Sequence, residues 1–561
     1  MNSWFSTLTF ALLLAFAGLV RHPNPQPAPA PRSIEELTAS IPICGQSHVG
    51  GIPATVLRQP VALRTGLGAV ATPMSGKSHE AQAFFEQGMA YLHGYVLVEA
   101  ARSFHQALRA DSTLVLAHVG LSRVYSQLDD TTAARREARR AKALENFASE
   151  REKAHVAVRF AQLWATDDLS SKTRRLAYRR ALRRATRQFP DDYELWLLAG
   201  NAQEQHANGR GQGSTPEGIA VYERLLRLAP DLPAAHHYLI HSYEGTKAYD
   251  KALLHGEVYA RLAPSLPHAR HMYAHDLMKT GQIDAAIARL AAADSIERRT
   301  YETERYKPDY DWHHAHNLTL LALCYQYQGR LAEAEVLLRR VYAMTRPGNV
   351  KWAFYTKKSY PELLLTIGRS AEAEALATEL TRAQTGGERF LGHYLLGRAL
   401  AQRQNWAEAR REAAAAGAEL TALRRSDPTG AVVAGRLQPF SRYLSALLDL
   451  HESGNRPEAL ANVRAFQQSA RNQFGPDGWI EALFQLETIA QLAQDAGLNV
   501  FAGEATKTLA DHDAGYAGTH HALAGLARQR GDAATVQHEM SLASAGWQRA
   551  DAEFKKRVDL K

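Results

Sequence analysis

Histidine is concentrated in one short stretch of this sequence. The chain of 561 residues contains 24 histidines, and ten of them fall between His236 and His316, a density well above the chain average. Two pairs in this stretch have i, i+4 spacing, which places both imidazoles on one face of a helix. Such pairs, together with a carboxylate, can ligate Zn, Cu, Ni or non-haem Fe. The spacing does not choose among these metals.

The elements that position these histidines follow from a sequence repeat. When each unit is numbered from its first residue, positions 4, 8 and 11 form one helix stripe, and positions 20, 24 and 27 form another. Small residues at positions 8 and 20 allow close helix approach, and a breaker near position 32 ends the pair. One such hairpin cannot bury its apolar face alone, so neighbouring units must stack. Units begin at Ala81, Val115, Pro233, Pro267, Ala315, Phe390, Phe440 and Ala517.

Histidine recurs on one stripe of successive units. Positions 2, 5, 9 and 12 span only about 80° of a helix, on a face separate from the packing stripe. Neighbouring helices pack about 8–10 Å apart, so imidazoles from adjacent stripes can converge. His313 and His316 lie at the start of the first helix of the following unit. The residues on the stripes of the preceding two units are His237, His241, Glu244, His268, His271 and His275.

The repeat pattern resembles the tetratricopeptide repeat across residues 80–550. The resemblance implies an all-α fold, an α-solenoid of antiparallel helix pairs with a concave inner surface. In that family the second stripe faces the concave groove, so the resemblance places the histidines there. We expect residues 207–217 to form a loop within one unit and residues 294–311 to form a second insertion.

The histidine stripe admits three interpretations. The first is a metal site formed by His237, His241, Glu244, His268, His271, His275, His313 and His316, with Zn, Cu or Fe as the expected ion. The second is a groove that binds a peptide or an acidic ligand without metal, and the third treats these side chains as half-buried spacers between repeats. His236, His393 and His520 fall at position 4 of their units, the packing stripe, so we interpret them as structural.

Several segments also resemble a more specific group, the exported bacterial tetratricopeptide proteins of uncharacterised function. The residues 272–276 depart from the usual Met-Pro-Ser-His-Ile of that group, and His118-Val119 stands where it has an aromatic pair. The group lends no activity. The resemblance is carried by residues 84–88, 107–108, 237–244, 267–275, 316–318 and 511–523.

The N-terminus indicates export. Residues 5–20 are a nearly continuous apolar run that contains Ala15-Phe16-Ala17, a small-x-small cleavage site. The run lacks a basic n-region, so a short membrane anchor and a cytoplasmic chain remain as alternatives. We therefore expect a periplasmic or cell-envelope protein. The predicted segments are a signal peptide or anchor at 1–20, a Pro-rich linker and extended segment at 21–80, helical repeats at 81–550 and a C-terminal tail at 551–561.

Charge and cysteine content exclude several function classes. The net charge of the chain is +8, and residues 135–187 hold 16 Lys or Arg against 6 Asp or Glu. We interpret this basic stretch as a solvated outer face, with an anionic membrane or partner surface as the alternative and nucleic acid disfavoured. Two cysteines, Cys44 and Cys324, exclude a disulfide scaffold, and Cys324 lies inside an ordinary repeat helix.

The sequence therefore predicts an exported binding scaffold whose His-rich concave groove holds a protein, a peptide or a small ligand. The alternative is a metal-dependent enzyme of oxidase or hydrolase type that uses the same residues as ligands. No His-Glu-x-x-His, Gly-x-Ser-x-Gly or phosphate-binding glycine loop is present. Membrane association through the N-terminus stays open, as do the partner and the oligomeric state.

Overall fold

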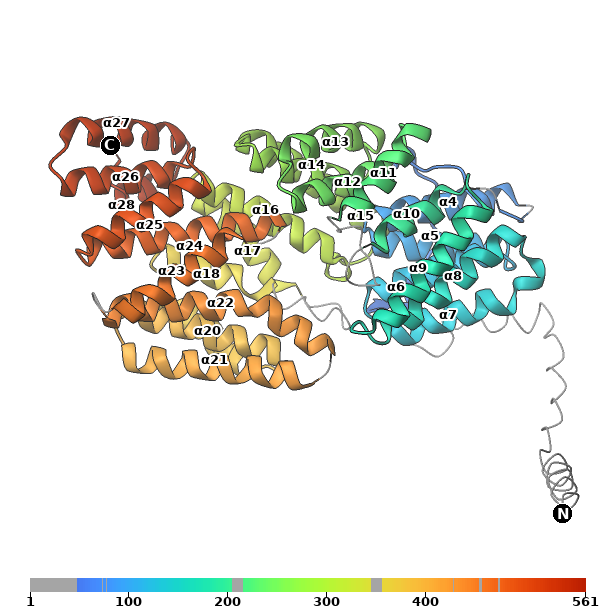
Figure 1. Ribbon diagram of the computed structural model, residues 1–561, viewed down its shortest axis with the longest axis horizontal. Coiled ribbons are helices and arrows are strands. Elements are labelled where there is room, and N and C mark those ends of the chain that lie inside the picture. Colours follow the sequence, from blue (N-terminus) through green and yellow to red (C-terminus); the bar gives the residue numbers. More distant parts are fainter. Residues whose placement is uncertain are drawn as a thin grey trace, which may run out of the picture. The chain divides into compact units, whose positions relative to one another are not determined.

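Antiparallel helix pairs follow one another along the chain (Figure 1). The computed structural model describes residues 48–560 except 73, 77, 204–214, 345–355, 427, 454–456 and 473–474. Residues 47–561 belong to one unit. The predicted signal or anchor, the Pro-rich run, Cys44 and most of the 207–217 insertion lie outside the described residues.

The first half of the array supplies most of the histidine-rich stretch. A two-stranded antiparallel ribbon and a short helix precede it, formed by β1 (His48–Val49), β2 (Ile52–Pro53) and α3 (Ala54–Arg58). The helices that follow are α4 (His79–His93), α5 (Leu97–Ala110), α6 (Val115–Gln127), α7 (Thr131–Ala143), η1 (Glu145–Phe147), α8 (Glu150–Thr166), α9 (Lys172–Gln188), α10 (Tyr193–Asn201), α11 (Pro216–Leu228), α12 (Pro233–Gly245), α13 (Tyr249–Leu262), α14 (Pro267–Lys279) and α15 (Ile283–Glu304).

The second half continues the same alternation. Its helices are η2 (Pro308–Tyr310), α16 (Trp312–Tyr327), α17 (Leu331–Ala343), α18 (Ser359–Thr366), α19 (Ser370–Thr381), α20 (Gly386–Gln402), α21 (Trp406–Ser426), α22 (Pro428–Ser453), α23 (Pro457–Arg471), α24 (Gly475–Asp495), α25 (Asn499–His512), α26 (Ala517–Gln529), α27 (Ala533–Gly546) and α28 (Ala552–Arg557). None of the helices among the described residues is long and apolar enough to cross a membrane. The predicted all-α solenoid is confirmed.

Many of the hairpins turn on a residue with left-handed backbone conformation. Position 15 of the unit has positive φ in every unit where the structure describes it, and glycine fills it at Gly281, Gly329 and Gly531. A left-handed residue after the last helical turn lets the chain reverse, and glycine adopts that conformation without steric cost. The first unit places Tyr95 there instead, with φ 56°. A tyrosine in this conformation is uncommon, and its ring reaches the histidines described below.

Small residues at position 8 allow the close helix approach that the pattern predicts. A Cβ added at Gly88 would lie 2.6 Å from the Phe104 ring, and one at Gly120 would lie 2.5 Å from the same ring. Phe104 is fully buried, at position 24 of the first unit. Two consecutive hairpins therefore pack around one aromatic side chain.

The N-terminal segment folds against the array instead of forming a linker throughout. The Gly50 amide donates to the Asp130 carboxylate (2.9 Å), and the Ser265 amide donates to the Gly66 carbonyl (2.8 Å). Arg64 forms an ion pair with Glu304 at the end of α15. Residues 48–72 of the segment predicted as linker and extended chain therefore pack on the array, because their polar groups have partners on three separate repeats.

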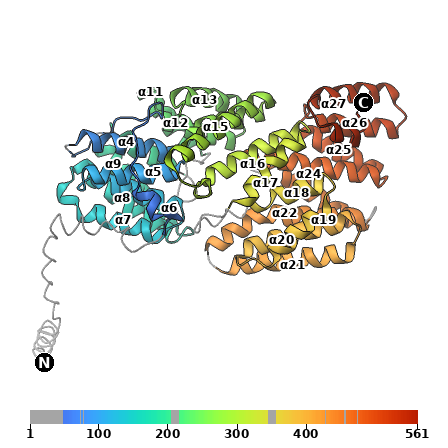
Figure 2. The same cartoon turned by 180° about the vertical axis from the view of Figure 1, so that it is seen from behind.

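The C-terminus also packs against an earlier repeat. The indole of Trp547 is buried and donates to the Tyr327 carbonyl (3.2 Å), and the Asp551 amide donates to the Gly329 carbonyl (3.1 Å). Helix α28 follows directly, with Phe554 beside Gly329. The segment predicted as a tail thus contains a helix, α28, which is docked on the turn between α16 and α17. Helix α24 likewise lies beside α16 (Figures 1 and 2).

Candidate metal centre

The first helices of three consecutive units bring the predicted histidines together. Helix α12 carries His237 and His241, α14 carries the next three, and α16 carries His313 and His316. A proline at the first position of α12 and of α14 presets the helical φ and fixes where each helix starts. Helix α14 contacts both α12 and α16. The shared register therefore places the three stripes side by side.

In the part of the chain that the structure describes, three groups of histidines have ligand nitrogens within 4.8 Å of one another. Two of these groups share no residue, and the third lies between them and borrows one histidine from each. We call the first the α12 trio and the second the α16 trio. The α12 trio is His237, His241 and His268, the α16 trio is His271, His275 and His316, and the intermediate group is His268, His271 and His313.

In the α12 trio, three Nε2 atoms meet. His237 Nε2 lies 3.1 Å from His241 Nε2 and 2.9 Å from His268 Nε2. The opposite nitrogen of His241 faces the Glu244 carboxylate at 3.3 Å. The opposite nitrogen of His268 lies 2.8 Å from His313 Nε2, and His313 Nδ1 lies 2.6 Å from Glu297.

In the α16 trio, two Nε2 atoms face each other. His271 Nε2 lies 2.8 Å from His275 Nε2. His275 Nδ1 lies 3.2 Å from the Glu244 carboxylate, and His316 Nδ1 lies 3.1 Å from Asp477 on α24. The remaining Nδ1 atom, that of His271, lies 2.9 Å from the Asn317 side-chain oxygen.

The outer partners determine where the ring protons lie. An ionised carboxylate can only accept, so each Nδ1 that faces Glu244 or Asp477 carries the proton. The Asn317 amide donates to the Leu290 carbonyl, which directs its oxygen at His271 and makes that Nδ1 a donor as well. In a neutral ring the other nitrogen then has a lone pair and no hydrogen. His271 and His275 therefore face each other with two unprotonated nitrogens.

The same reasoning holds in the α12 trio. The Glu297 carboxylate accepts a hydrogen bond from His313 Nδ1–H, so His313 Nε2 accepts from His268 Nδ1–H and His268 Nε2 is unprotonated. His241 Nε2 is unprotonated because the proton of the neutral ring is on Nδ1, which faces the Glu244 carboxylate. A single proton on His237 can satisfy only one of these two neighbours. Lone pairs that converge in this way repel one another unless a cation lies between them, and histidine binds metal as the neutral ring with its other N–H held by a carboxylate or carbonyl.

Burial keeps most of these rings neutral. It lowers the pKa of His237, His268 and His271 well below the usual value, and neighbouring imidazoles lower it further. Burial also opposes ionisation of Glu297, but His313 and His314 outweigh it and lower the pKa of this carboxyl to about 2. Asp477 overcomes the effect of burial at His316 and raises its pKa.

Aromatic rings enclose the cluster. The Tyr95 ring centroid lies 4.9 Å from that of His237 and 5.0 Å from that of His268, and Trp312 lies 5.9 Å from His316. His237 and His271 are completely buried. Most of these histidines are therefore buried, because the first hairpin turn and α24 pack over the stripes.

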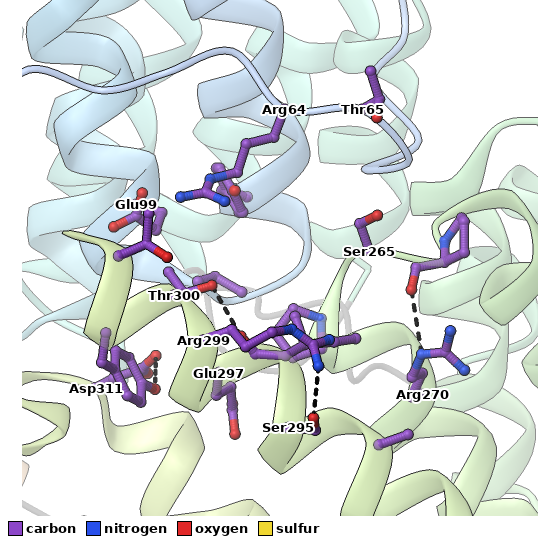
Figure 3. Close-up of a pocket in the computed structure, with 18 of the residues that line it drawn as sticks. Arg64, Thr65, Glu99, Ser265, Arg270, Ser295, Glu297, Arg299, Thr300 and Asp311 are labelled. Atoms are coloured by element: carbon purple, nitrogen blue, oxygen red, sulfur yellow. Dashed lines mark hydrogen bonds between the residues drawn. The ribbon is translucent and has the colours of Figure 1, made fainter.

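A cavity of about 780 Å³ borders the cluster at its Glu297 side. The N-terminal segment contributes Arg64 and Thr65, and α15 contributes Arg299 and Thr300 (Figure 3). Glu297 itself lines this cavity while it holds His313. A small molecule in the cavity would thus lie one side chain away from the histidine network.

A family comparison identifies the repeat. Residues 362–430 match the model described as tetratricopeptide repeat. These residues span α18 to the start of α22, so the similarity to a tetratricopeptide repeat is shown for this part of the array. Among curated proteins no sequence matches it. One similar solved structure is a chain of the crystal structure of APC/C hetero-tetramer Cut9-Hcn1, with 12% identity and a TM-score of 0.31 over 86% of this chain and 96% of that chain.

Histidines on the packing stripe of the repeat array join the two helices of one hairpin. His118 lies 2.8 Å from Glu137, His393 lies 2.6 Å from Glu412, and His520 lies 2.7 Å from Glu539, each pair 19 residues apart. The unit from Pro233 has the same geometry with His236 and His255, 2.9 Å apart. These contacts lie within single hairpins, as expected for structural histidines.

Sequence reasoning missed part of the centre. Glu297 belongs to the insertion that we expected at residues 294–311. The only sequence feature that pointed to a role in the centre was its position shortly before the histidines of α16. Asp477 lies 161 positions after His316, so the repeat register gave no reason to join them. Tyr95 lies at a turn position where the pattern expects glycine.

The structure also locates Cys324 and the basic stretch at residues 135–187. Cys324 is buried, and its sulfur lies 3.6 Å from the Met278 sulfur; burial raises the pKa of the thiol, which fits a core residue. In the basic stretch, Arg135 pairs with Asp167 and Lys142 pairs with Glu145 at the surface. Four arginines of α9 line a separate hollow: Arg180, Arg183, Arg184 and Arg187.

Proposed function

We propose that the chain is an exported tetratricopeptide-repeat scaffold that carries a transition metal in its buried histidine cluster. Repeats of this kind generally mediate protein–protein interaction. The observation that carries the metal proposal is the close approach of Nε2 atoms within the α12 and α16 trios. Glu244 and Asp477 hold the outer ring protons, as in known histidine metal sites.

The donor set fits Zn, Cu or Fe and does not choose among them. Imidazole suits all three metals, and three protein ligands leave a coordination position for water or a substrate. Chelating resins and affinity tags also load metals, so the protein is to be purified without a tag. Metal content is then measured by inductively coupled plasma mass spectrometry.

The decisive comparison uses two variants with histidines removed. One carries alanine at His237, His241, His271 and His275, and the other carries alanine at the exposed residues His79, His451 and His538. We expect a stoichiometric transition metal in the natural protein and in the surface variant, and loss of it in the cluster variant with helical content kept. Absence of metal from all three after reconstitution would contradict the proposal.

A second candidate function is a metal-dependent enzyme of oxidase or hydrolase type. It is favoured by the cavity that borders Glu297, since Glu297 holds His313 at the edge of the cluster. A substrate bound there would approach an open coordination position of the metal. Oxidase and hydrolase screens with the metal-loaded protein, repeated after chelation, test this candidate. Turnover that survives complete removal of the metal would contradict it.

The remaining parts of the proposal concern partners and place. We propose a protein or peptide partner on the array, a periplasmic or cell-envelope location, and either cleavage or membrane retention of residues 1–20. Cell fractionation followed by N-terminal sequencing distinguishes a cleaved signal from a retained anchor. Recovery of the protein in the cytoplasm with Met1 intact would contradict export.

A further inference from the structure

We propose that the cluster holds two metal ions in two separate three-histidine sites, positioned by one shared carboxylate, that of Glu244. This inference rests on the proposed metal-binding function and specifies its stoichiometry. The α12 trio and the α16 trio have no residue in common. Each can therefore be filled without removing a ligand from the other.

The ring orientations favour the two outer trios over the intermediate group. In both outer trios, Nε2 atoms face one another at 2.8–3.1 Å. The intermediate group would need His268 Nδ1, which already donates to His313. It would also need a nitrogen of His271, whose two nitrogens face Asn317 and His275. An ion in the middle would therefore break contacts that two ions at the outer trios preserve.

Glu244 connects the two sites. One of its oxygens lies 3.3 Å from His241 Nδ1 and the other lies 3.2 Å from His275 Nδ1. Only 10% of its side chain is exposed, so both oxygens depend on these histidines for partners. A carboxylate that accepts from a ligand histidine fixes the ring orientation and increases the basicity of the ligating nitrogen. Glu244 does this for one ligand in each trio.

Asp477 makes the α16 trio depend on the C-terminal repeats. It holds only His316, and it lies on α24, which packs against α14 and α16. Nothing equivalent joins Asp477 to the α12 trio. Substitutions at the two carboxylates are therefore expected to differ in their effect on metal affinity. Removing Glu244 weakens both sites, whereas removing Asp477 weakens only the α16 trio.

The experiment measures Zn²⁺ stoichiometry and affinity by competition with a chromophoric chelator. The natural protein is expected to bind two ions, and His241→Ala and His275→Ala are each expected to bind one. In the His275→Ala background, E244Q is expected to weaken the remaining site about 10–100-fold, whereas D477N leaves it unchanged. In the His241→Ala background both substitutions are expected to weaken it by that factor.

The control is E412Q, which removes a carboxylate from His393 outside the cluster. It is expected to leave both affinities unchanged. Circular dichroism and thermal unfolding check each variant, and His241→Gln and His275→Gln replace the alanine variants if those fail to fold. One ion in the natural protein, lost in both single variants, would overturn the two-site inference but keep the proposed function. No ion in the natural protein would overturn both.

Discussion

Glu487 on α24 makes the stability of this protein depend on pH. Its side chain is half-buried, and the Tyr516 hydroxyl donates to its carboxylate at 2.8 Å. Burial raises the pKa of Glu487 from 4.5 to about 7, in spite of the hydrogen bond from Tyr516 and the nearby Arg557 charge, both of which lower it. Between pH 4.5 and about 7, the folded chain therefore keeps a proton on this carboxyl, whereas the unfolded chain has already lost it.

The sign and size of the effect follow from linkage. An acid whose pKa is raised on folding contributes its full stability below the unfolded value, and this contribution is lost as the pH rises from 4.5 through 7. Above pH 7 the loss approaches about 3 kcal/mol, since each pKa unit corresponds to about 1.4 kcal/mol. Replacing Glu487 with glutamine removes the ionisation and keeps an oxygen that accepts from Tyr516.

Urea unfolding of the natural protein and of E487Q at pH 4.5, 6, 7 and 8.5 measures this effect. The difference in free energy of unfolding, variant minus natural protein, is expected to rise by about 3 kcal/mol across that range, because contributions of all other groups cancel. E504Q, at a carboxylate that is 45% exposed, is expected to give a flat difference. A flat difference for E487Q as well would refute the reasoning.

Two further predictions concern the packing of the repeats. Gly88→Ala is expected to destabilise the protein by about 1–3 kcal/mol because the new methyl group would meet the Phe104 ring at 2.6 Å. Gly417→Ala is expected to stabilise it by about 0.5–1 kcal/mol, since nothing lies within 4 Å of the added atom on α21; equal signs in urea unfolding would contradict the packing argument. His118→Ala is expected to cost about 1–3 kcal/mol because its clasp is buried. The same change at His393, where both partners are more than 20% exposed, is expected to cost under about 1 kcal/mol; a larger loss at His393 in thermal or urea unfolding would count against the role of burial.

The repeat register predicted which histidines lie close together, but it did not predict all of the carboxylates that accept hydrogen bonds from them. Residues on one stripe of successive units must lie side by side once the hairpins stack, so His237 and His271 could be placed together from spacing alone. Asp477 is brought to the cluster by packing between distant repeats, which no local period encodes. The same kind of long-range contact explains why α28 is a docked helix and not a tail.

The solvent exposure of the histidines was the other feature that could not be predicted from their spacing in the sequence. A stripe that faces the inside of a solenoid is open only if no other segment fills that space. Here Tyr95, held at a left-handed turn, and the helix that carries Asp477 both pack over the stripe. The interpretation of the histidines consequently shifts from a groove that touches a partner to a buried centre.

The central claim is that these imidazoles are metal ligands, and X-ray absorption at the metal edge tests it most directly. The measurement uses untagged protein as purified, then the same sample loaded with Zn²⁺. The account predicts a first shell of nitrogen and oxygen with multiple scattering from about three imidazoles per ion and no sulfur. A first shell of oxygen alone, or one that is unchanged when His271 and His275 are replaced with alanine, would contradict the claim.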